Sequence, residues 1–153
     1  KRFISAPQFI LGITFGSGSL IAYSLETSVF SASILTLYIG IVAWIISFDT
    51  YYALQDKNDD LEIGVNSTAI LWAENAIIYS KVLHLAFYAS LLTIAIINSF
   101  SYFFFFIFIG LFYLFLHQNK LLKNSDYLGA FKINNWIGII SVSGFALEII
   151  FLN

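Results

Sequence analysis

The sequence has no cysteine, no methionine, a single proline and few charged side chains. Without cysteine, disulfide-stabilised folds, thiolate metal sites and cysteine nucleophiles are excluded. Because there is no methionine at position 1 or elsewhere, we expect the chain to be a piece or a processed product of a longer one. The formal net charge of -2 gives no general attraction to nucleic acid, so we expect no such partner.

Hydrophobic residues are abundant instead. They make up 59% of the 153 residues, and charged residues make up 10%, whereas a soluble domain has about 25% charged residues. So few charges cannot cover a surface that faces water on all sides. The composition therefore predicts an integral membrane protein with membrane lipid as a partner.

Five segments are long and apolar enough to cross a membrane as helices, which takes about 20 residues. They are residues 7–24, 31–48, 82–97, 100–116 and 136–152. A more mixed stretch, residues 68–80, precedes the third span and is suited to the membrane interface. No span alternates apolar and polar residues as the strands of a membrane barrel do. The sequence predicts an all-α, polytopic membrane helical bundle forming one domain over residues 1–153.

The basic residues lie on one side of these five spans. If the connecting loops alternate sides, every lysine and arginine falls on the side of the N-terminus: Lys1, Arg2, Lys57, Lys81, Lys120, Lys123 and Lys132. Cytoplasmic loops carry an excess of lysine and arginine. We therefore expect this side, with the acidic residues near Lys57, to face the cytoplasm.

Gly12 and Gly16 form a G-x-x-x-G pair in the first span, with Gly18 nearby. In an apolar helix this spacing usually allows the backbone of a neighbouring helix to approach closely. We interpret it as a packing surface, and a groove for a ligand is the alternative.

Acidic residues concentrate after the second span, where residues 49–62 hold five of the nine in the chain. If the second helix continues beyond the membrane, Asp49, Tyr52, Asp56 and Asp60 share one of its faces. Carboxylates at i and i+4 repel each other, and a divalent cation between them reverses that effect. Mg²⁺ is typically held by one or two carboxylates together with water and substrate phosphates. Asp56 and Asp60 are thus candidate Mg²⁺ ligands.

Polar residues with turn and capping preferences follow the acidic cluster. Gly64 permits a turn, and Ser67 or Thr68 can cap the next helix. The competing interpretation is a solvated polar loop without chemistry. A membrane cation transporter would also place acidic residues where its pathway opens at the membrane surface, although it needs polar residues deep in several spans. A structural membrane subunit would need no aspartate cluster.

At these residues the sequence resembles the UbiA superfamily of membrane prenyltransferases, in particular 4-hydroxybenzoate polyprenyltransferases. The matching motif is Asp49-Thr50-x-Tyr52-Ala53-x-x-Asp56-x-x-Asp59-Asp60-x-x-x-Gly64-x-x-Ser67-Thr68-Ala69. Two further segments are similar to the family's: Lys1-Arg2 with Pro7-Gln8 and Leu11-Gly12, and Asn134-Asn135-Trp136-x-Gly138. The resemblance implies that the five spans correspond to the C-terminal five of the family's nine helices.

The resemblance also implies roles for the residues of this motif. Asp56 and Asp60 match the metal-binding pair of the family's second aspartate motif. Asp49 matches an acidic position beside it and is a candidate catalytic residue with that pair. The remaining candidates are substrate-binding residues: Lys1, Lys57, Tyr52 and Asp59. The family's first aspartate motif does not occur in this chain, so we expect the chain alone to be inactive.

The implied activity is Mg²⁺-dependent transfer of a polyprenyl group from polyprenyl diphosphate to the ring of 4-hydroxybenzoate, in ubiquinone biosynthesis. Homogentisate, naphthoates and haem are alternative acceptors within the family. The implied location is a bacterial inner (plasma) membrane.

Overall fold

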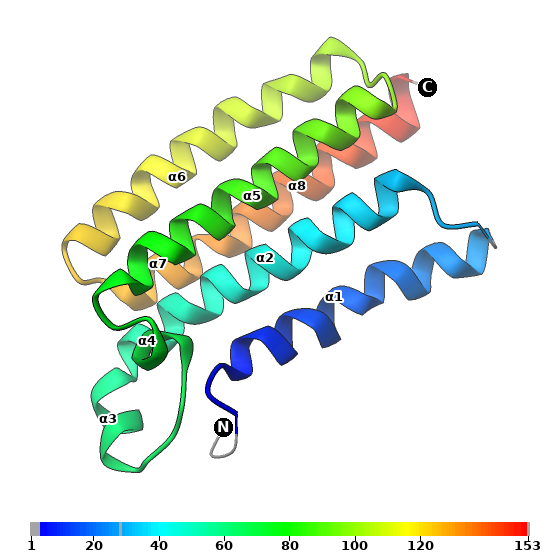
Figure 1. Cartoon of the computed structure of the whole chain (residues 1–153). Helices are drawn as coiled ribbons and strands as arrows, with labels where there is room; N and C mark the ends of the chain where they lie inside the picture. Colours follow the sequence, from blue (N-terminus) through cyan, green and yellow to red (C-terminus); the bar gives the residue numbers. More distant parts are fainter. Residues whose placement is uncertain (1–3, 28, 153) are drawn as a thin grey trace. The chain divides into compact units, whose positions relative to one another are not determined.

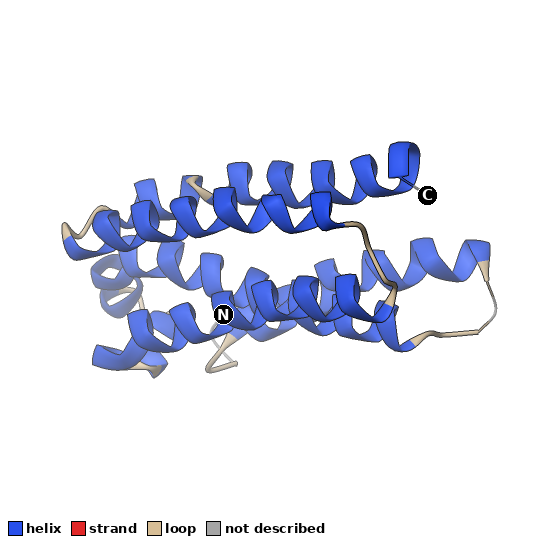
Figure 2. Cartoon of the chain, turned by 90° about the horizontal axis from the view of Figure 1, so that it is seen from above, coloured by secondary structure: helices blue, strands red, loops and turns tan. Residues whose placement is uncertain are grey.

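The computed structural model describes residues 4–27 and 29–152. In that part of the chain all regular structure is helical (Figure 1, Figure 2). Five helical segments are long and apolar enough to cross a membrane. The predicted all-α membrane architecture and its number of spans are therefore confirmed. The chain divides into two compact units, Lys1–Ile94 and Ala95–Asn153, which are described separately below.

The first unit holds three long helices and two short ones near one end of them (Figure 1). Its elements are α1 (Pro7–Glu26), α2 (Ala32–Gln55), α3 (Lys57–Glu62), α4 (Thr68–Leu71), a 3-10 turn (Ala73–Asn75) and α5 (Ala76–Ile97), whose last residues belong to the second unit. Pro7 begins α1, where the missing N–H has no partner to lose. Ser31 caps α2 by accepting a hydrogen bond from the Ile34 amide at 3.3 Å.

Two of these helices extend further than the apolar runs predict. Helix α2 continues past residue 48 to Gln55, and α5 already begins at Ala76 rather than near residue 82. Hydropathy locates only the part of a helix that suits lipid, whereas a helix also continues through polar residues that face water or neighbouring elements. The stretch 68–80 accordingly forms α4, the 3-10 turn and the first turn of α5.

Helices α1 and α2 pack closely at the paired glycines. A Cβ atom on Gly12 would lie 3.0 Å from the Val42 carbonyl oxygen, and one on Gly16 would lie 2.9 Å from Val42 Cγ2. Gly18 has open space around it. The packing interpretation of the G-x-x-x-G pair is therefore confirmed for Gly12 and Gly16.

A second close approach joins α2 to α5. A Cβ atom on Gly40 would lie 2.6 Å from Ser90 Cβ. One turn further along α2, the rings of Trp44 and Phe87 stack with centroids 4.7 Å apart and planes 7° from parallel. The small residues let the two backbones approach, and the aromatic pair fills the space beside them.

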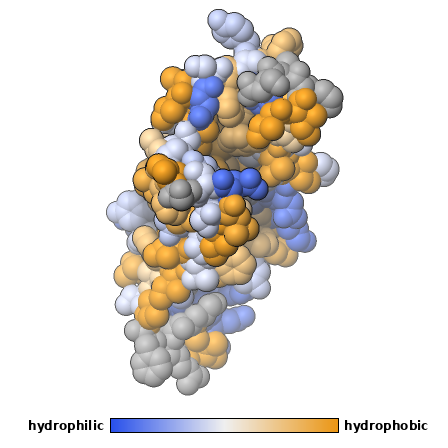
Figure 3. All heavy atoms as spheres, turned by 90° about the vertical axis from the view of Figure 1, so that its right-hand side faces the viewer, coloured by the Kyte–Doolittle hydropathy of each residue, from blue (hydrophilic) through white to orange (hydrophobic). Residues whose placement is uncertain are grey.

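Large hydrophobic side chains also cover the outer faces of the helices. Orange hydrophobic residues occupy much of the face in Figure 3. Phe15, Ile39 and Ile109, for example, are 70%, 67% and 67% exposed. Exposed apolar surface of this extent suits contact with lipid chains rather than with water.

The second unit contains two long helices linked by a short one. Its elements are a 3-10 turn (Tyr102–Phe106), α6 (Ile107–Lys123), α7 (Tyr127–Lys132), α8 (Asn134–Leu147) and a π-helical turn (Glu148–Leu152). The Asp126 side chain caps α7 by accepting a hydrogen bond from the Gly129 amide at 2.8 Å. The buried Gln118 of α6 donates to the Ala130 carbonyl at 2.8 Å and so attaches α7 to α6.

At the opposite end of α8 from α7, the Glu148 side chain is buried, with 2% of its surface exposed. One carboxylate oxygen accepts from the Ser101 amide and the other from the Ser101 hydroxyl, both at 2.6 Å. The carboxylate thus satisfies two donors just before the 3-10 turn that leads into α6.

We expect Glu148→Gln to destabilise this end of the second unit by about 1 kcal/mol, because a neutral amide replaces the carboxylate that accepts two charge-assisted hydrogen bonds. Hydrogen exchange of the Ser101 amide and the thermal midpoint in detergent measure the effect. Glu74→Gln, at an exposed position, is the matched control. Equal behaviour of the two variants would contradict the prediction.

Candidate functional site

The predicted site residues occupy the end of α2 and the short helix α3. Asp49 is half-buried and Tyr52 is 41% exposed, both on α2. Asp56 lies between the two helices, and the backbone amide of Asp60 in α3 donates to the Asp56 carbonyl at 2.9 Å. This hydrogen bond places the candidate metal ligands one helical turn apart.

The helix does not continue through the cluster, so the expectation of one shared face is wrong. Helix α2 ends at Gln55, and Asp56 has φ -94° and ψ 4°, outside the helical range. Aspartate and asparagine have low helix propensity, and neighbouring carboxylates repel each other. Asp49 and Tyr52 therefore belong to one helix and Asp60 to another.

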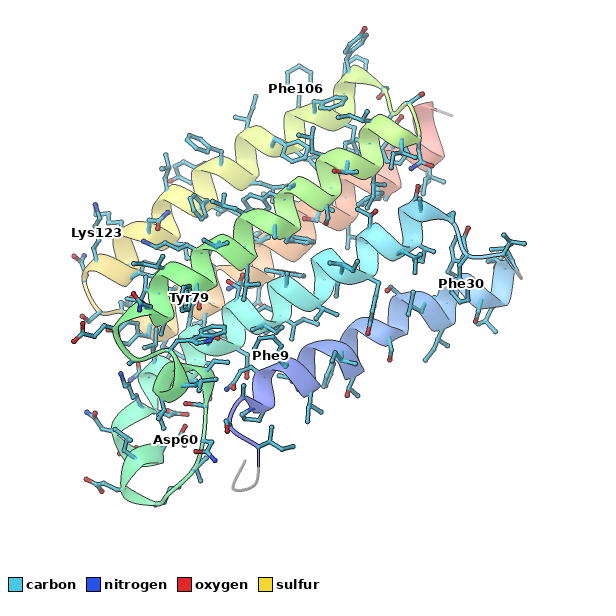
Figure 4. All side chains as sticks on the ribbon, viewed as in Figure 1. Phe9, Phe30, Asp60, Tyr79, Phe106 and Lys123 are labelled. Carbon is cyan, nitrogen blue, oxygen red and sulfur yellow. The ribbon has the colours of Figure 1, made fainter. Side chains whose placement is uncertain are left out.

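Asp60, labelled in Figure 4, lies on the short helix α3. It is the most buried of these carboxylates, with 7% of its surface exposed. Its Oδ2 atom is buried and has no hydrogen-bond partner among the described residues. A buried carboxylate oxygen without a partner is costly, since the lost hydration is not replaced. A cation beside it would replace that hydration, so the carboxylate is suited to bind one.

The ligand set fits a metal that takes most of its ligands from elsewhere. Over the described residues, no group of three or more histidine, cysteine, aspartate or glutamate side chains is arranged to hold a metal. Asp56 and Asp60 supply two carboxylates. Mg²⁺ is commonly held by such a pair, with water and substrate phosphates completing its coordination.

The loop after α3 turns back toward the helices. The Val65 amide donates to the Asp60 carbonyl at 2.8 Å, and Gly64 has φ +68°, the left-handed region that glycine adopts without strain. Ser67 then caps α4 by accepting from the Ile70 amide at 3.4 Å. The predicted turn at Gly64 and cap at Ser67 are confirmed.

A buried hydrogen-bonded cluster attaches this loop to α1 and α2. The Thr68 amide donates to Gln8 Oε1 of α1 at 3.0 Å, and the Thr68 hydroxyl is 2.7 Å from the Thr50 hydroxyl of α2. Gln8 is 2% exposed, and both threonines are fully buried. We call Gln8, Thr50 and Thr68 the Thr68 cluster.

The other predicted residues lie around the same helix junction. Lys57 is the half-buried first residue of α3, and Asp59 is exposed on the same helix. Lys1 lies outside the described residues. Asp56, Lys57, Asp59 and Asp60 thus lie within five consecutive positions at the start of α3.

Sequence reasoning assigned no role to Gln8 or Thr50, although both belong to the segments that carry the family resemblance. The available signal was a polar amide near the start of an apolar helix, next to Pro7. Their partner is Thr68, which lies 60 positions from Gln8. A separation of that length is not visible in local sequence patterns.

Comparison with known proteins gives a consistent match. The model of the UbiA prenyltransferase family matches residues 1–139. The 4-hydroxybenzoate octaprenyltransferase of Psychromonas ingrahamii is 32% identical over 150 residues, covering 96% of this chain and 52% of that protein. Proteins of the same name from Enterobacter sp. and Francisella tularensis subsp. mediasiatica are 30% and 34% identical, over 97% and 92% of this chain and 52% and 50% of their own lengths.

The chain spans about half the length of the curated relatives it matches. No solved structure matches the chain. The family match nevertheless covers most of the sequence, including residues 49–62, the aspartate-rich segment. The chain belongs to the UbiA prenyltransferase family.

Proposed function

We propose that the full-length protein transfers a polyprenyl group from a polyprenyl diphosphate to the ring of 4-hydroxybenzoate, in a Mg²⁺-dependent step of ubiquinone biosynthesis. Family membership supports prenyl transfer, and the similarity to 4-hydroxybenzoate octaprenyltransferases supports this acceptor. The structural observation that carries the proposal is the buried Oδ2 atom of Asp60, which has no hydrogen-bond partner among the described residues and lies one helical turn from Asp56. This site suits a cation that binds a diphosphate.

In this proposal the predicted site residues at and near the junction of α2 and α3 have separate roles. Asp56 and Asp60 hold Mg²⁺, which when bound neutralises charge on the diphosphate and makes it a better leaving group. Lys57 and Lys1 contact diphosphate oxygens. Tyr52 and Asp59, whose side chains are exposed, contact the substrates. Asp49 is a further catalytic carboxylate on α2.

The chemistry breaks two bonds, the allylic C–O bond and a ring C–H bond, and forms one C–C bond. The bond between the allylic carbon and the diphosphate oxygen breaks, and its electron pair leaves with the diphosphate. A ring carbon beside the hydroxyl of 4-hydroxybenzoate bonds to the allylic cation, and the proton on that carbon is then lost. Apolar helix surfaces keep water from the cation and accommodate the isoprenoid tail.

We further propose that the chain is the C-terminal part of one UbiA-type domain in a bacterial inner membrane, with the aspartate-rich segment facing the cytoplasm. The one-sided distribution of lysine and arginine in the sequence supports this orientation. Labelling of a single cysteine introduced at exposed Asn58 by a membrane-impermeant reagent tests it. Labelling of inside-out vesicles but not of intact cells is the expected result.

An activity assay tests the proposed function. Membranes containing the full-length protein should form prenylated 4-hydroxybenzoate from a polyprenyl diphosphate, and chelation of Mg²⁺ should abolish the product. Homogentisate and a hydroxynaphthoate, supplied in parallel, test the acceptor. Product from one of these alone would replace the acceptor, and no prenylated product from any of them would overturn the proposed activity.

A further inference from the structure

We propose that the Thr68 cluster is a positioning device that holds the Asp60 carboxylate in its metal-binding arrangement. The inference rests on the proposed function and assigns Gln8, Thr50 and Thr68 as positioning residues that do not touch the substrates. The juxtaposition that carries it is a complete hydrogen-bonded chain from α1 through α4 to α2, buried beside the helix that bears Asp60.

The donors and acceptors of the cluster can be assigned individually. The Thr50 hydroxyl donates to the Ile46 carbonyl at 2.6 Å within α2. Because a hydroxyl has a single proton, Thr50 must accept the proton of the Thr68 hydroxyl. The Thr68 amide is among the first amides of α4, which have no partner within the helix, and Gln8 accepts from it. Thr68 therefore uses both of its donors, one toward each long helix.

This arrangement fixes the segment on which Asp60 lies. Helix α4 contacts both α2 and α3, and the Asp60 carbonyl accepts from the Val65 amide two residues before the Ser67 cap. The backbone between Asp60 and Thr68 is thus closed at one end by the Asp60–Val65 hydrogen bond and attached at the other by the Thr68 cluster. Loss of the attachment would let α3 move and would widen the range of Asp60 positions.

Residues that orient a metal ligand change metal affinity or activity by about 10–100-fold when they are removed. We therefore expect the cluster to affect the concentration of Mg²⁺ required more than the rate at saturating Mg²⁺. A purely structural role would lower the amount of folded protein and leave the Mg²⁺ dependence of the folded fraction unchanged.

The test compares Gln8→Met and Thr68→Val with the wild type in the full-length protein. Gln8→Met leaves the buried Thr68 amide without an acceptor, and Thr68→Val removes only the hydroxyl. Each variant should need about tenfold more Mg²⁺ for half-maximal activity, with the rate at saturation within about twofold of the wild type. Thr68→Ser, which keeps the hydroxyl, should restore the wild-type Mg²⁺ requirement. Thr93→Val is the matched control because the Thr93 hydroxyl is exposed and bonds within its own helix.

Hydrogen exchange of the Val65 amide gives a readout that does not depend on product formation. In the wild type, Mg²⁺ alone should slow this exchange, and the two variants should need about tenfold more Mg²⁺ for the same protection. An unchanged Mg²⁺ dependence in both variants, in activity and in exchange, would overturn the inference.

The two proposals fail in different ways. Suppose that Mg²⁺ protects the Val65 amide of the wild type from exchange and that the variants need more Mg²⁺ for this protection, but no prenylated product forms. The proposed function then fails and the positioning role stands. If the wild type forms product and the variants have the same Mg²⁺ dependence as the wild type, only the positioning role fails. If Mg²⁺ neither protects the Val65 amide nor supports product formation in the wild type, both are overturned.

Discussion

Asp60→Asn should reduce Mg²⁺-dependent prenyl transfer by the full-length protein by on the order of 100-fold or more. The substitution keeps the size of the side chain but replaces a carboxylate oxygen with an amide nitrogen that cannot bind a cation. Asp60 is 7% exposed, and its Oδ2 atom has no other partner among the described residues. The variant should therefore fold at least as well as the wild type while losing activity.

Product formation at saturating polyprenyl diphosphate, measured across a Mg²⁺ titration, checks this result, and the thermal midpoint in detergent reports folding. Asp126→Asn is the matched control, since Asp126 is exposed at the cap of α7, where asparagine caps equally well. Activity of Asp60→Asn close to that of the control would exclude Asp60 from the metal site.

Gly40→Val should destabilise the first unit by about 3 kcal/mol, because overpacking of a tight helix contact displaces side chains and backbone. Even the Cβ atom of the new side chain would lie 2.6 Å from Ser90 Cβ. The stacked Trp44 and Phe87 rings occupy the adjacent part of the same contact and limit how far α2 and α5 can separate.

The thermal midpoint of the protein in detergent measures the effect. Gly18→Val is the matched control, since no atom lies within 4 Å of a Cβ built at Gly18 and valine is at least as favourable as glycine within a helix. In the Gly40→Val background, Ser90→Gly should recover part of the lost stability. Similar stability of the two glycine variants would show that α2 and α5 do not approach closely at Gly40.

Part of this architecture is readable from local sequence. The apolar runs predict the five spans because the cost of placing polar groups in lipid acts on each segment by itself. The paired Gly12 and Gly16 indicate a packing surface because their spacing is a property of one helix. Gly64 and Ser67 predict a turn and a cap for the same local reason, and the structure confirms both.

Local sequence did not predict where each helix begins and ends, or which residues its small side chains contact. Sequence alone gave no reason to single out Gly40, because its role depends on Ser90 of another helix. Similarly, local sequence gave no partner for Glu148, whose carboxylate is buried against Ser101, 47 positions away. In both cases the decisive contact joins segments that are distant along the chain.

The sequence by itself determined that this protein is a helical membrane protein with an acidic segment after its second span, because composition and short-range spacing carry that information. Only the tertiary structure decided that the helix breaks at Asp56 and that Asp60 is the buried carboxylate of the cluster. It also decided that Thr68 joins Gln8 to Thr50. Burial and long-range hydrogen bonds depend on which helices pack together, and that packing is a property of the whole fold rather than of any one segment.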